Sequence, residues 1–397
     1  MKYLLLGAGL QGTAIAFDLL HQTDGTSKLV VVDADQTALD ALSGKVADPR
    51  LLTVLGDVRD DSLLAEHARE ADVMVSAVNY WFNEHLTQLA LQHRCHFLDL
   101  GGNNEVVSRQ FELDETARER GVTVIPDCGL APGVAGILAC HLQRPFTSVE
   151  HLRIRVGGLP LRPQPPLDYQ LVFAVQGLIN EYVEPAVVIR DGRIAQVPSL
   201  TELETLRFPA PFGELEAFQT SGGTSTLPDT LLGRVHNLDY KTIRYSGHGE
   251  RMRLLMDLGL MGDEPVVMPD GAAVKPRDLL GHLLERHLPR EGDDVVLMLV
   301  EVEGMAPTVG DVAPAPCRRS LRVIDHADQD TGISAMMRMT GYPAAIIARM
   351  LASGVITDRG VCRQEVVVPA ERMLEELAAR GVRIEQWDSH PAAPPDV

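Results

Sequence analysis

The chain has 397 residues and a net charge of −19, with 45% hydrophobic and 23% charged residues. Its length favours two or three structural units with packed cores. The negative charge argues against nucleic acid or an anionic membrane as a partner, because both would be repelled. A cationic small molecule is the compatible kind of substrate.

Apolar runs and cysteines indicate the compartment. No apolar run approaches the ~20 residues of a membrane span, and the first run is too short for a secretory signal. The five cysteines are odd in number and scattered, which fits reduced thiols. We therefore expect a cytoplasmic protein. His93, Cys95 and His96 lie close together, but their spacing does not match a zinc site, and we expect no metal.

A glycine-rich turn is the strongest motif. The apolar run Tyr3–Leu6 leads into Gly7, Gly9 and Gly12, and Thr13–His21 then has an amphipathic helical pattern. Gly7 permits a tight turn, Gly9 lets the backbone approach a pyrophosphate, and Gly12 lets the helix pack on the strand. The helix N-terminus offers N–H donors and partial positive charge to phosphates. This order predicts a dinucleotide-binding site.

The next strand pattern indicates which dinucleotide binds. Leu29–Val32 ends on Asp33, whose carboxylate can accept hydrogen bonds from the ribose hydroxyls and would repel a 2′-phosphate. We therefore expect NAD rather than NADP. Strand order alone places Asp57 near adenine or its ribose, and Asn79 toward the nicotinamide. The predicted cofactor contacts are Gly7, Gly9, Leu10, Gln11, Gly12, Asp33, Asp57, Val58, Val78 and Asn79.

Strand and helix patterns alternate up to residue 125. The predicted strands are Tyr3–Leu6, Leu29–Val32, Leu51–Leu55, Val73–Ala77, His96–Leu100 and Val122–Ile125. Helical patterns lie between them, at Thr13–His21, Gln36–Leu42, Asp61–Arg69, Asn83–His93 and Asp114–Arg120. Apolar strands without interruption are covered on both faces, so we predict a Rossmann-type, doubly wound parallel sheet of the α/β class. Its ligands bind at the carboxyl ends of the strands.

Strand patterns dominate the second half of the chain. They cover His151–Val156, Ala186–Arg190, Arg234–Tyr245, Asp294–Val302 and Arg319–Val323, with a helix at Lys275–Leu288. We predict a second, α+β domain at 126–333 for substrate binding and dimerisation. The helical pattern Ser334–Ala352 is expected to return to the first domain, which then comprises 1–125 and about 334–388. Residues 389–397 are expected to be a disordered tail. A homodimer is the default expectation.

The loop Pro126–Gly133 joins a strand to a helix and carries Asp127. Its place at a strand end puts Asp127 near the nicotinamide end of a bound dinucleotide. The alternative is a hinge shaped by glycine and proline.

Two further loops offer polar side chains. Thr220–Leu227, which contains Thr224, can bind a carboxylate or amine through hydroxyls and backbone N–H groups, or can be a solvated turn. The second of these loops, at 157–169, carries Arg162 and Tyr169 as candidate substrate contacts.

The segment Asp239–His248 reads as a strand ending in a turn. Alternation puts Arg244 on one strand face and Lys241 on the other. Arg244 can clamp a carboxylate, and His248 or Lys241 can transfer protons near neutral pH. The alternative is an exposed strand with solvated cations.

Several segments together carry a family resemblance. They are Leu98–Gly102, Pro126–Gly133, Val156–Pro160, Thr220–Leu227, Lys241–His248, Val274–Asp278 and Gly354–Gly360. In order, they resemble the saccharopine dehydrogenase-like family, and most closely its lysine 6-dehydrogenase branch. The similarity runs from the first strand to about residue 385.

The resemblance implies NAD-dependent oxidative deamination of the ε-amino group of L-lysine. The products would be ammonia, NADH and 2-aminoadipate 6-semialdehyde, which cyclises to piperideine-6-carboxylate. Arg244 is then the best candidate to hold the α-carboxylate. Asp127 and His248 compete as general base, and we favour His248 for proton transfer and Asp127 for amine placement.

Two alternatives remain. A saccharopine- or carboxynorspermidine-type oxidoreductase would act on a secondary amine, and the extra carboxylates of its substrate would need further cations beside Arg244 and Arg162. An NAD-binding regulatory protein would bind without turnover. The presence of Asp127, Arg244 and His248 together argues against the second alternative.

Overall fold

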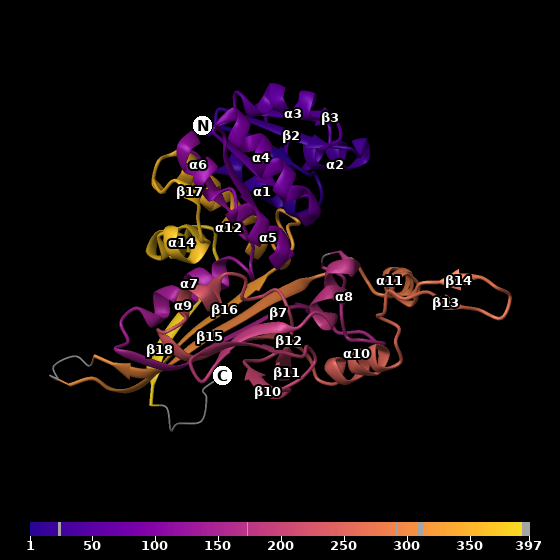
Figure 1. Cartoon of the computed structure of the whole chain (residues 1–397), viewed down its shortest axis with the longest axis vertical. Helices are drawn as coiled ribbons and strands as arrows, with labels where there is room; N and C mark the ends of the chain where they lie inside the picture. Colours follow the sequence, from indigo (N-terminus) through magenta and orange to yellow (C-terminus); the bar gives the residue numbers. More distant parts are fainter. Residues whose placement is uncertain (23–24, 173, 291, 308–312, 391–397) are drawn as a thin grey trace. The chain divides into compact units, whose positions relative to one another are not determined.

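The computed structural model describes residues 1–22, 25–172, 174–290, 292–307 and 313–390 (Figure 1). The chain divides into two compact units. The first comprises Met1–His141 and Met337–Val382, and the second comprises Leu142–Met336 and Arg383–Val397.

These limits differ from the predicted domain boundaries at two places. Residues 126–141 belong to the first unit, where His141 Nδ1 lies 3.3 Å from Glu371 Oε1. The segment Ile384–Ser389 is a strand that pairs with the second unit's sheet. From residue 391 onward, the predicted tail lies outside the described residues.

The first unit is built on a seven-stranded sheet whose pairs are all parallel, in the order β17-β6-β5-β4-β1-β2-β3. The strands are β1 (Lys2–Leu6), β2 (Lys28–Asp33), β3 (Leu51–Leu55), β4 (Val73–Ser76), β5 (His96–Asp99), β6 (Thr123–Ile125) and β17 (Gly360–Val361). Successive residues Leu4, Leu5 and Leu6 are all fully buried, so both faces of β1 are covered. The predicted doubly wound parallel sheet is confirmed.

Helices connect these strands. They are α1 (Leu10–His21), α2 (Gln36–Val46), α3 (Asp61–Ala68), η1 (Tyr80–Phe82), α4 (Asn83–His93), α5 (Asn104–Phe111), α6 (Asp114–Arg120), α7 (Val134–Gln143), α12 (Ala335–Ala352), α13 (Gln364–Val367) and α14 (Ala370–Ala379). The direction of strand order reverses at β1, which lies between β4 and β2. A crevice at the carboxyl ends of these strands is the usual ligand position in such a sheet.

A buried ion network ties the C-terminal helices to α1. The Asp18 carboxylate accepts hydrogen bonds from Arg349 Nη2 at 2.8 Å and from Arg380 Nε at 2.5 Å. Gly341 of α12 packs so closely that a Cβ there would lie 2.6 Å from the Ala14 Cβ. These contacts explain why α12 and α14, distant in sequence, belong to the first unit.

The second unit has a nine-stranded mixed sheet. Its main order is β10-β11-β12-β7-β15-β16-β18, and β8 joins β12 and β9. The strands are β7 (Ser148–Pro160), β8 (Ala186–Arg190), β9 (Arg193–Val197), β10 (Glu204–Phe208), β11 (Gly213–Gln219), β12 (Val235–Tyr245), β15 (Asp294–Ala306), β16 (Ala315–His326) and β18 (Ile384–Ser389). β12 and β7 are parallel, and the other pairs are antiparallel. The predicted α+β character is confirmed.

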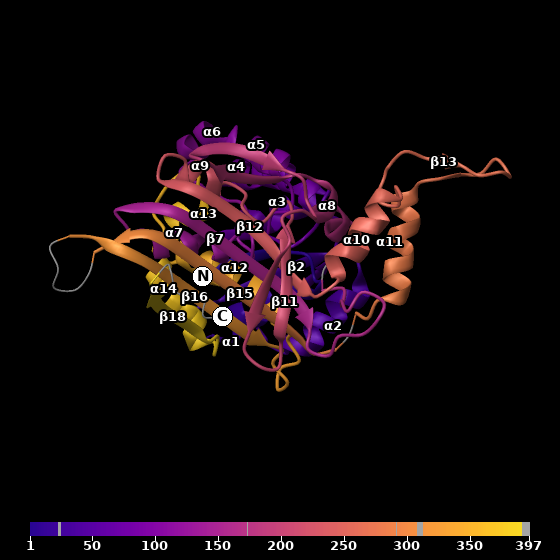
Figure 2. The same ribbon diagram turned by 90° about the horizontal axis from the view of Figure 1, so that it is seen from below.

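Among the described residues of this unit, four helices and a small hairpin accompany the sheet. The helices are α8 (Val175–Val183), α9 (Leu227–Leu231), α10 (His248–Asp257) and α11 (Pro276–His287). The hairpin of β13 (Val266–Val267) and β14 (Ala273–Val274) extends outward beside α10 and α11 (Figure 2). Within the described residues, every helix is too short or too polar to cross a membrane.

Candidate active site

The glycine turn after β1 has the geometry of a dinucleotide-binding loop. Gly7 has φ of +103°, and a Cβ there would lie 2.7 Å from the Ala77 carbonyl oxygen. A Cβ on Gly12 would come within 1.9 Å of the Gly7 oxygen. A Cβ on Gly9 would meet no atom within 4 Å. The turn is therefore closed at Gly7 and Gly12 but open at Gly9, where a pyrophosphate would approach.

The start of α1 has unused polar groups. Its N-cap, Gly9, provides no side-chain acceptor for the first-turn N–H groups. Leu10 is 56% exposed, and Gln11 Oε1 is buried without a hydrogen-bond partner. Free N–H donors at a helix N-terminus suit a phosphate. The residues present therefore fit the phosphate part of a nicotinamide dinucleotide.

Asp33 lies at the carboxyl end of β2. Its Oδ2 accepts a 2.6 Å hydrogen bond from Ala8 N, and its Oδ1 accepts one of 2.8 Å from Asp35 N. These bonds hold the carboxylate beside the glycine turn, where a ribose would bind.

The other predicted cofactor contacts lie after β3 and β4. Asp57 is bonded to Arg59, whose guanidinium lowers the pKa of that carboxyl to about 2. Val58 packs in the hydrophobic core, against which Val78 is also packed, and Asn79 is the N-cap of η1. As cofactor contacts, these four residues stay predictions, as do Asp33 and the residues of the glycine turn.

The Asp127 loop is held by a second acid. Asp127 follows β6 with φ of +62°, and its backbone N donates to Asp99 Oδ1 at 3.1 Å. The Asp99 carboxylate also accepts from Gly101 N and Gln110 Nε2, each at 2.8 Å. A Cβ on Gly101 would lie 1.9 Å from Asp127 Oδ1, so glycine is needed there. Sequence reasoning missed Asp99, although an acid ending a buried strand was visible in the pattern.

In the second unit, Arg244 is surrounded by aromatic side chains. Its Nε donates to the Tyr182 hydroxyl at 3.2 Å, and Nη1 donates to the Ile243 oxygen at 3.0 Å. Its guanidinium carbon lies 4.8 Å from the centre of the Tyr169 ring. Arg244 is 3% exposed. The structure thus brings together two predicted substrate contacts, Arg244 and Tyr169.

His248 joins this cluster through Tyr182. Its Nδ1 lies 3.0 Å from the Leu167 carbonyl oxygen, and its Nε2 lies 2.9 Å from the Tyr182 hydroxyl. A carbonyl can only accept, so Nδ1 carries the proton and the Tyr182 O–H donates to Nε2. Burial, together with the charge of Arg244, lowers the pKa of His248 to about 3. The ring is therefore neutral at physiological pH with both nitrogens bonded, which suits a positioning role better than the proton transfer that we expected.

Glu181, the neighbour of Tyr182, was missed by sequence reasoning. Its Oε2 lies 4.0 Å from Arg244 Nη2, and its side chain is 32% exposed. Desolvation raises the pKa of Glu181 to about 7, against the opposing charge of Arg244. The Tyr169 hydroxyl is also notable, because it is buried without a hydrogen-bond partner among the described residues. Unpaired buried hydroxyls are rare, and a bound water, ion or ligand is one of the reasons for them.

A buried carboxylate, Glu216 of β11, fixes the start of α10. Its two oxygens accept from Gly247 N at 2.7 Å and Gly249 N at 2.6 Å. Since Gly247 has φ of +87°, the turn depends on glycine as well as on this cap. Glu216, which sequence reasoning also missed, therefore holds His248 in place.

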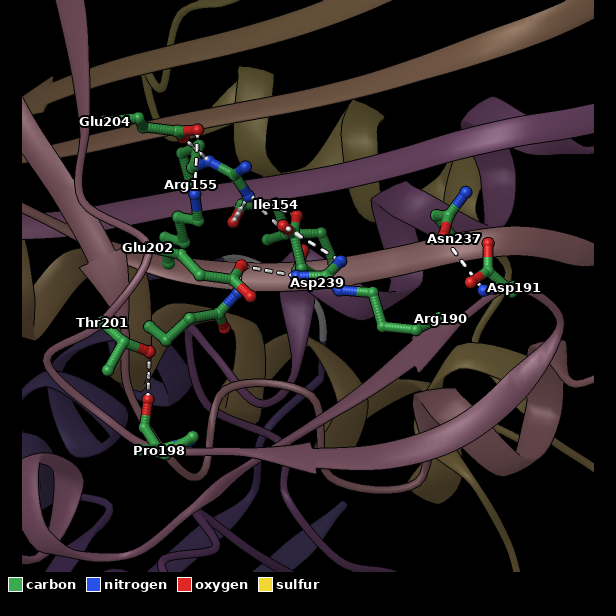
Figure 3. A network of polar contacts seen from close by, with 12 residues as sticks. Ile154, Arg155, Arg190, Asp191, Pro198, Thr201, Glu202, Glu204, Asn237 and Asp239 are labelled. Carbon is green, nitrogen blue, oxygen red and sulfur yellow. Dashed lines mark hydrogen bonds and ion pairs between the residues drawn. The ribbon is translucent and has the colours of Figure 1, made fainter.

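Lys241 lies apart from this cluster. Its Nζ forms a 2.9 Å ion pair with Glu204, which also pairs with Arg155. Figure 3 shows Arg155 between Glu204 and Asp239, and Arg155 Nη1 lies 2.8 Å from Asp239 Oδ1. Burial opposes ionisation of Glu204, but Arg155 and Lys241 outweigh it and lower its pKa. Lys241 therefore belongs to an ion network on the strand face opposite Arg244, away from the position expected for a proton carrier.

The two remaining predicted substrate contacts, Thr224 and Arg162, lie in different surroundings. Thr224 is buried, and its hydroxyl donates to the Val187 oxygen at 3.1 Å. Gly223 lies against the Tyr240 ring, where a Cβ would come within 2.4 Å. The Thr220–Leu227 loop is thus a buried turn and not a solvated one. Arg162 is exposed beyond the end of β7.

Comparison with known proteins identifies the family. The model of the saccharopine dehydrogenase C-terminal domain matches residues 129–382, and that of the saccharopine dehydrogenase NADP binding domain matches residues 3–125. The chain belongs to the saccharopine dehydrogenase family. Its first unit has the Rossmann-type fold, and the matched part is the family's nucleotide-binding domain.

Individual relatives are distant. A saccharopine dehydrogenase [NADP(+), L-glutamate-forming] from Pyricularia oryzae is 24% identical over 66% of this chain, which spans 58% of that protein. A carboxynorspermidine synthase from Vibrio cholerae is 20% identical over 99% of both chains. Apo saccharopine dehydrogenase (L-Glu forming) from Saccharomyces cerevisiae has a TM-score of 0.78 at 19% identity, over 98% of this chain and 99% of that one. At this identity, the structural likeness shows the fold alone.

Proposed function

We propose that the protein catalyses NAD-dependent oxidative deamination of the ε-amino group of L-lysine. The products are ammonia, NADH and 2-aminoadipate 6-semialdehyde, which cyclises to piperideine-6-carboxylate. The observation that carries the proposal is the cluster around Arg244, a buried guanidinium with a partly exposed acid, Glu181, 4.0 Å away. It offers a site for the carboxylate of lysine and a site for one of its two amines.

Substrate charge favours lysine over a secondary amine. Saccharopine carries additional carboxylates, which would need additional cations. Two other cations close to Arg244 in sequence, Lys241 and Arg251, already form ion pairs. Lys241 pairs with Glu204, and Arg251 lies 3.0 Å from Asp168. Arg244 is a buried cation whose Nη2 has no hydrogen bond among the described residues, and we take it as the group that binds the substrate carboxylate.

The chemistry also requires a proton acceptor. The ε-ammonium must lose its proton before the adjacent carbon gives up hydride, because a cation there opposes the developing positive charge. The bound dinucleotide supplies the hydride acceptor. We keep Asp127 as the residue that places the amine, since it stands at the carboxyl end of β6, and we move proton transfer to it from His248, whose ring nitrogens are both bonded. The same carboxylate would activate the water that hydrolyses the imine.

We propose NAD as the cofactor in preference to NADP. Asp33 is held beside the glycine turn by hydrogen bonds from Ala8 N and Asp35 N, so a carboxylate stands where a 2′-phosphate would need a cation. The relative from Pyricularia oryzae is an NADP(+) enzyme by name, so cofactor choice has to be measured on this chain.

A second candidate is a carboxynorspermidine-type reaction on a secondary amine. The similarity to the Vibrio cholerae synthase over 99% of both chains favours keeping it. The charge argument above stands against it.

A substrate panel separates these functions. The pure protein is incubated with NAD or NADP and with L-lysine, saccharopine, carboxynorspermidine or ornithine, and the absorbance of the reduced cofactor is followed. We expect turnover with L-lysine and NAD at the highest kcat/KM. Turnover with saccharopine but not with L-lysine would refute the proposal, and turnover with none of them would favour a binding protein.

A further inference from the structure

We propose that Glu181 and Arg244 together bind the α-ammonium and α-carboxylate of an amino-acid substrate, so that Glu181 selects for a free α-amine. This inference rests on the proposed function and deepens it, because it assigns the recognised end of the substrate. It concerns the second unit by itself.

The spacing of the two side chains supports a shared ligand. Their closest approach, 4.0 Å between Glu181 Oε2 and Arg244 Nη2, is longer than a hydrogen bond. The two charges therefore lie side by side without saturating each other. An α-amino acid carries its ammonium and carboxylate on one carbon, and so presents the complementary pair at matching separation.

The hydrogen bonds of Arg244 leave one end of the guanidinium for a ligand. Nε is used by Tyr182 and Nη1 by the Ile243 oxygen, whereas Nη2 is the atom nearest Glu181. The Tyr169 ring lies under the same guanidinium, and its buried hydroxyl has no partner among the described residues. A ligand oxygen or nitrogen would satisfy that hydroxyl, which otherwise carries a desolvation cost. The side chain of Glu181 is 32% exposed and that of Arg244 4%, so a solute can reach Glu181, and its carboxylate would meet the guanidinium behind it.

Several charged and titratable groups surround Glu181. They are Arg244 and Tyr240 on β12, Tyr182 on α8, Tyr169 in the preceding loop, and His248 on α10 beyond Tyr182. Burial raises the pKa of each tyrosine, and the pKa of His248 is lowered to about 3. Glu181 is therefore the group of this set that titrates near pH 7.

This protonation has a consequence for binding. A raised pKa means that part of the free protein holds a proton on Glu181 at neutral pH. An α-ammonium binds the ionised carboxylate, so binding releases that proton, and affinity rises as the pH rises through about 7.

Glu181 binds the α-ammonium of lysine and is not the general base at the reacting ε-carbon. The α-carboxylate on Arg244 fixes one end of lysine, and the ε-nitrogen is four methylene groups farther along the side chain. Glu181 is too close to Arg244 to contact both ends of an extended lysine.

Two matched ligand pairs test the inference. L-lysine is compared with 6-aminohexanoate, and L-norleucine with hexanoate, since each pair differs by the α-amine alone. The ligands are titrated by calorimetry into the holoenzyme saturated with NADH, in which no oxidation occurs. The variants are Glu181→Gln and, as a control on the same segment, Glu184→Gln.

We expect the wild type to bind each α-amino acid about 10-fold or more tightly than its deaminated partner. Glu181→Gln should remove this preference in both pairs and leave affinity for 6-aminohexanoate unchanged, which also shows that the variant folds. At pH 7, heats in buffers of different ionisation enthalpy should reveal proton release on L-lysine binding in the wild type and in Glu184→Gln, but not in Glu181→Gln.

Other outcomes overturn the inference. Equal loss of all four ligands would mean that Glu181 acts structurally. Loss confined to the ligands with an ε-amine, with the norleucine preference kept, would place Glu181 at the ε-nitrogen. If L-lysine is not turned over but the norleucine preference depends on Glu181, the proposed function fails while the α-amine site stands.

Discussion

Arg244 and His248 lie four residues apart, yet their surroundings give them different chemistry. Arg244 keeps an N–H group directed toward a partly exposed acid. His248 has both ring nitrogens bonded, and its burial keeps the imidazole neutral. The pair shows why residue type and position in a motif do not by themselves assign a catalytic role.

Asp33 should decide the cofactor. In Asp33→Ala the ribose hydroxyls lose their acceptor and the glycine turn loses the bond to Ala8 N. We expect the KM for NAD to rise about 10-fold or more, and the preference for NAD over NADP to fall. Initial rates with each cofactor measure this.

Asp35→Ala is the matched control, because the Asp35 carboxylate caps α2 by accepting from Thr37 N at 2.8 Å. It should cost about 1 kcal/mol of stability and leave the cofactor preference unchanged. An unaltered NAD requirement in Asp33→Ala would disprove the ribose assignment.

Sequence reasoning found Arg244, Tyr169 and Asp127 as candidate residues, but missed Glu181 and Tyr182. Arg244 was recognisable because alternation along a strand fixes which face a side chain takes. Glu181 and Tyr182 belong to the site because they lie beside Arg244 of β12, and Arg244 is 62 residues from Tyr182 in sequence. No local sequence pattern encodes such a tertiary contact.

At the scale of elements, α8 shows what a closer reading of periodicity would have found. Its buried residues are Val175, Leu178, Ile179 and Tyr182, which follow the i, i+3, i+4, i+7 pattern of one helix face. The sequence analysis predicts no element between the strands His151–Val156 and Ala186–Arg190. The helix pattern would have placed Tyr182 on the buried face.

The cap of α10 depends on Glu216. In Glu216→Gln one amide oxygen replaces two carboxylate oxygens, so one of the N–H groups of Gly247 and Gly249 loses its acceptor. We expect a loss of about 1–3 kcal/mol in unfolding free energy and a higher KM for the amine, because His248 shifts. Denaturant unfolding and initial rates measure both.

The control for this cap is Glu250→Gln, an exposed acid in the first turn of the same helix. It should change stability by less than about 0.5 kcal/mol. If Glu216→Gln behaved like this control, the carboxylate would not be fixing the turn.

The contacts of α12 and α14 with α1 depend on Asp18. Asp18→Asn removes the carboxylate shared by the buried guanidinium groups of Arg349 and Arg380, of which Arg380 keeps its ion pair with Glu376. We expect a loss of about 3–5 kcal/mol in unfolding free energy, measured by chemical denaturation.

Asp40→Asn serves as the reference variant, since Asp40 is an exposed acid on α2 that accepts from Gln36. Its effect should stay within about 0.5 kcal/mol. A similar small effect in Asp18→Asn would mean that apolar packing alone holds these helices.

For the whole molecule, the first sheet was predictable nearly strand by strand, but the second was not. Buried parallel strands such as β1 and β2 are continuous apolar runs between helices, and the apolar run Leu51–Leu55 also matches the half-exposed edge strand β3 at both ends. In the second unit, β9, β10 and β18 are half-exposed and carry mixed polar residues, so composition did not mark them. Strand β17 has two residues and no signal of its own. The homodimer stays a prediction.

The central claim is that nitrogen leaves from the ε-position of lysine. L-lysine labelled with heavy nitrogen at the ε-amine alone, incubated with the protein and NAD, tests it by mass spectrometry of the released ammonia. We predict labelled ammonia in equal amount to the NADH formed, and unlabelled ammonia from lysine labelled at the α-amine. NADH formed with the label retained in the organic product, or ammonia carrying the α-label, would contradict the account.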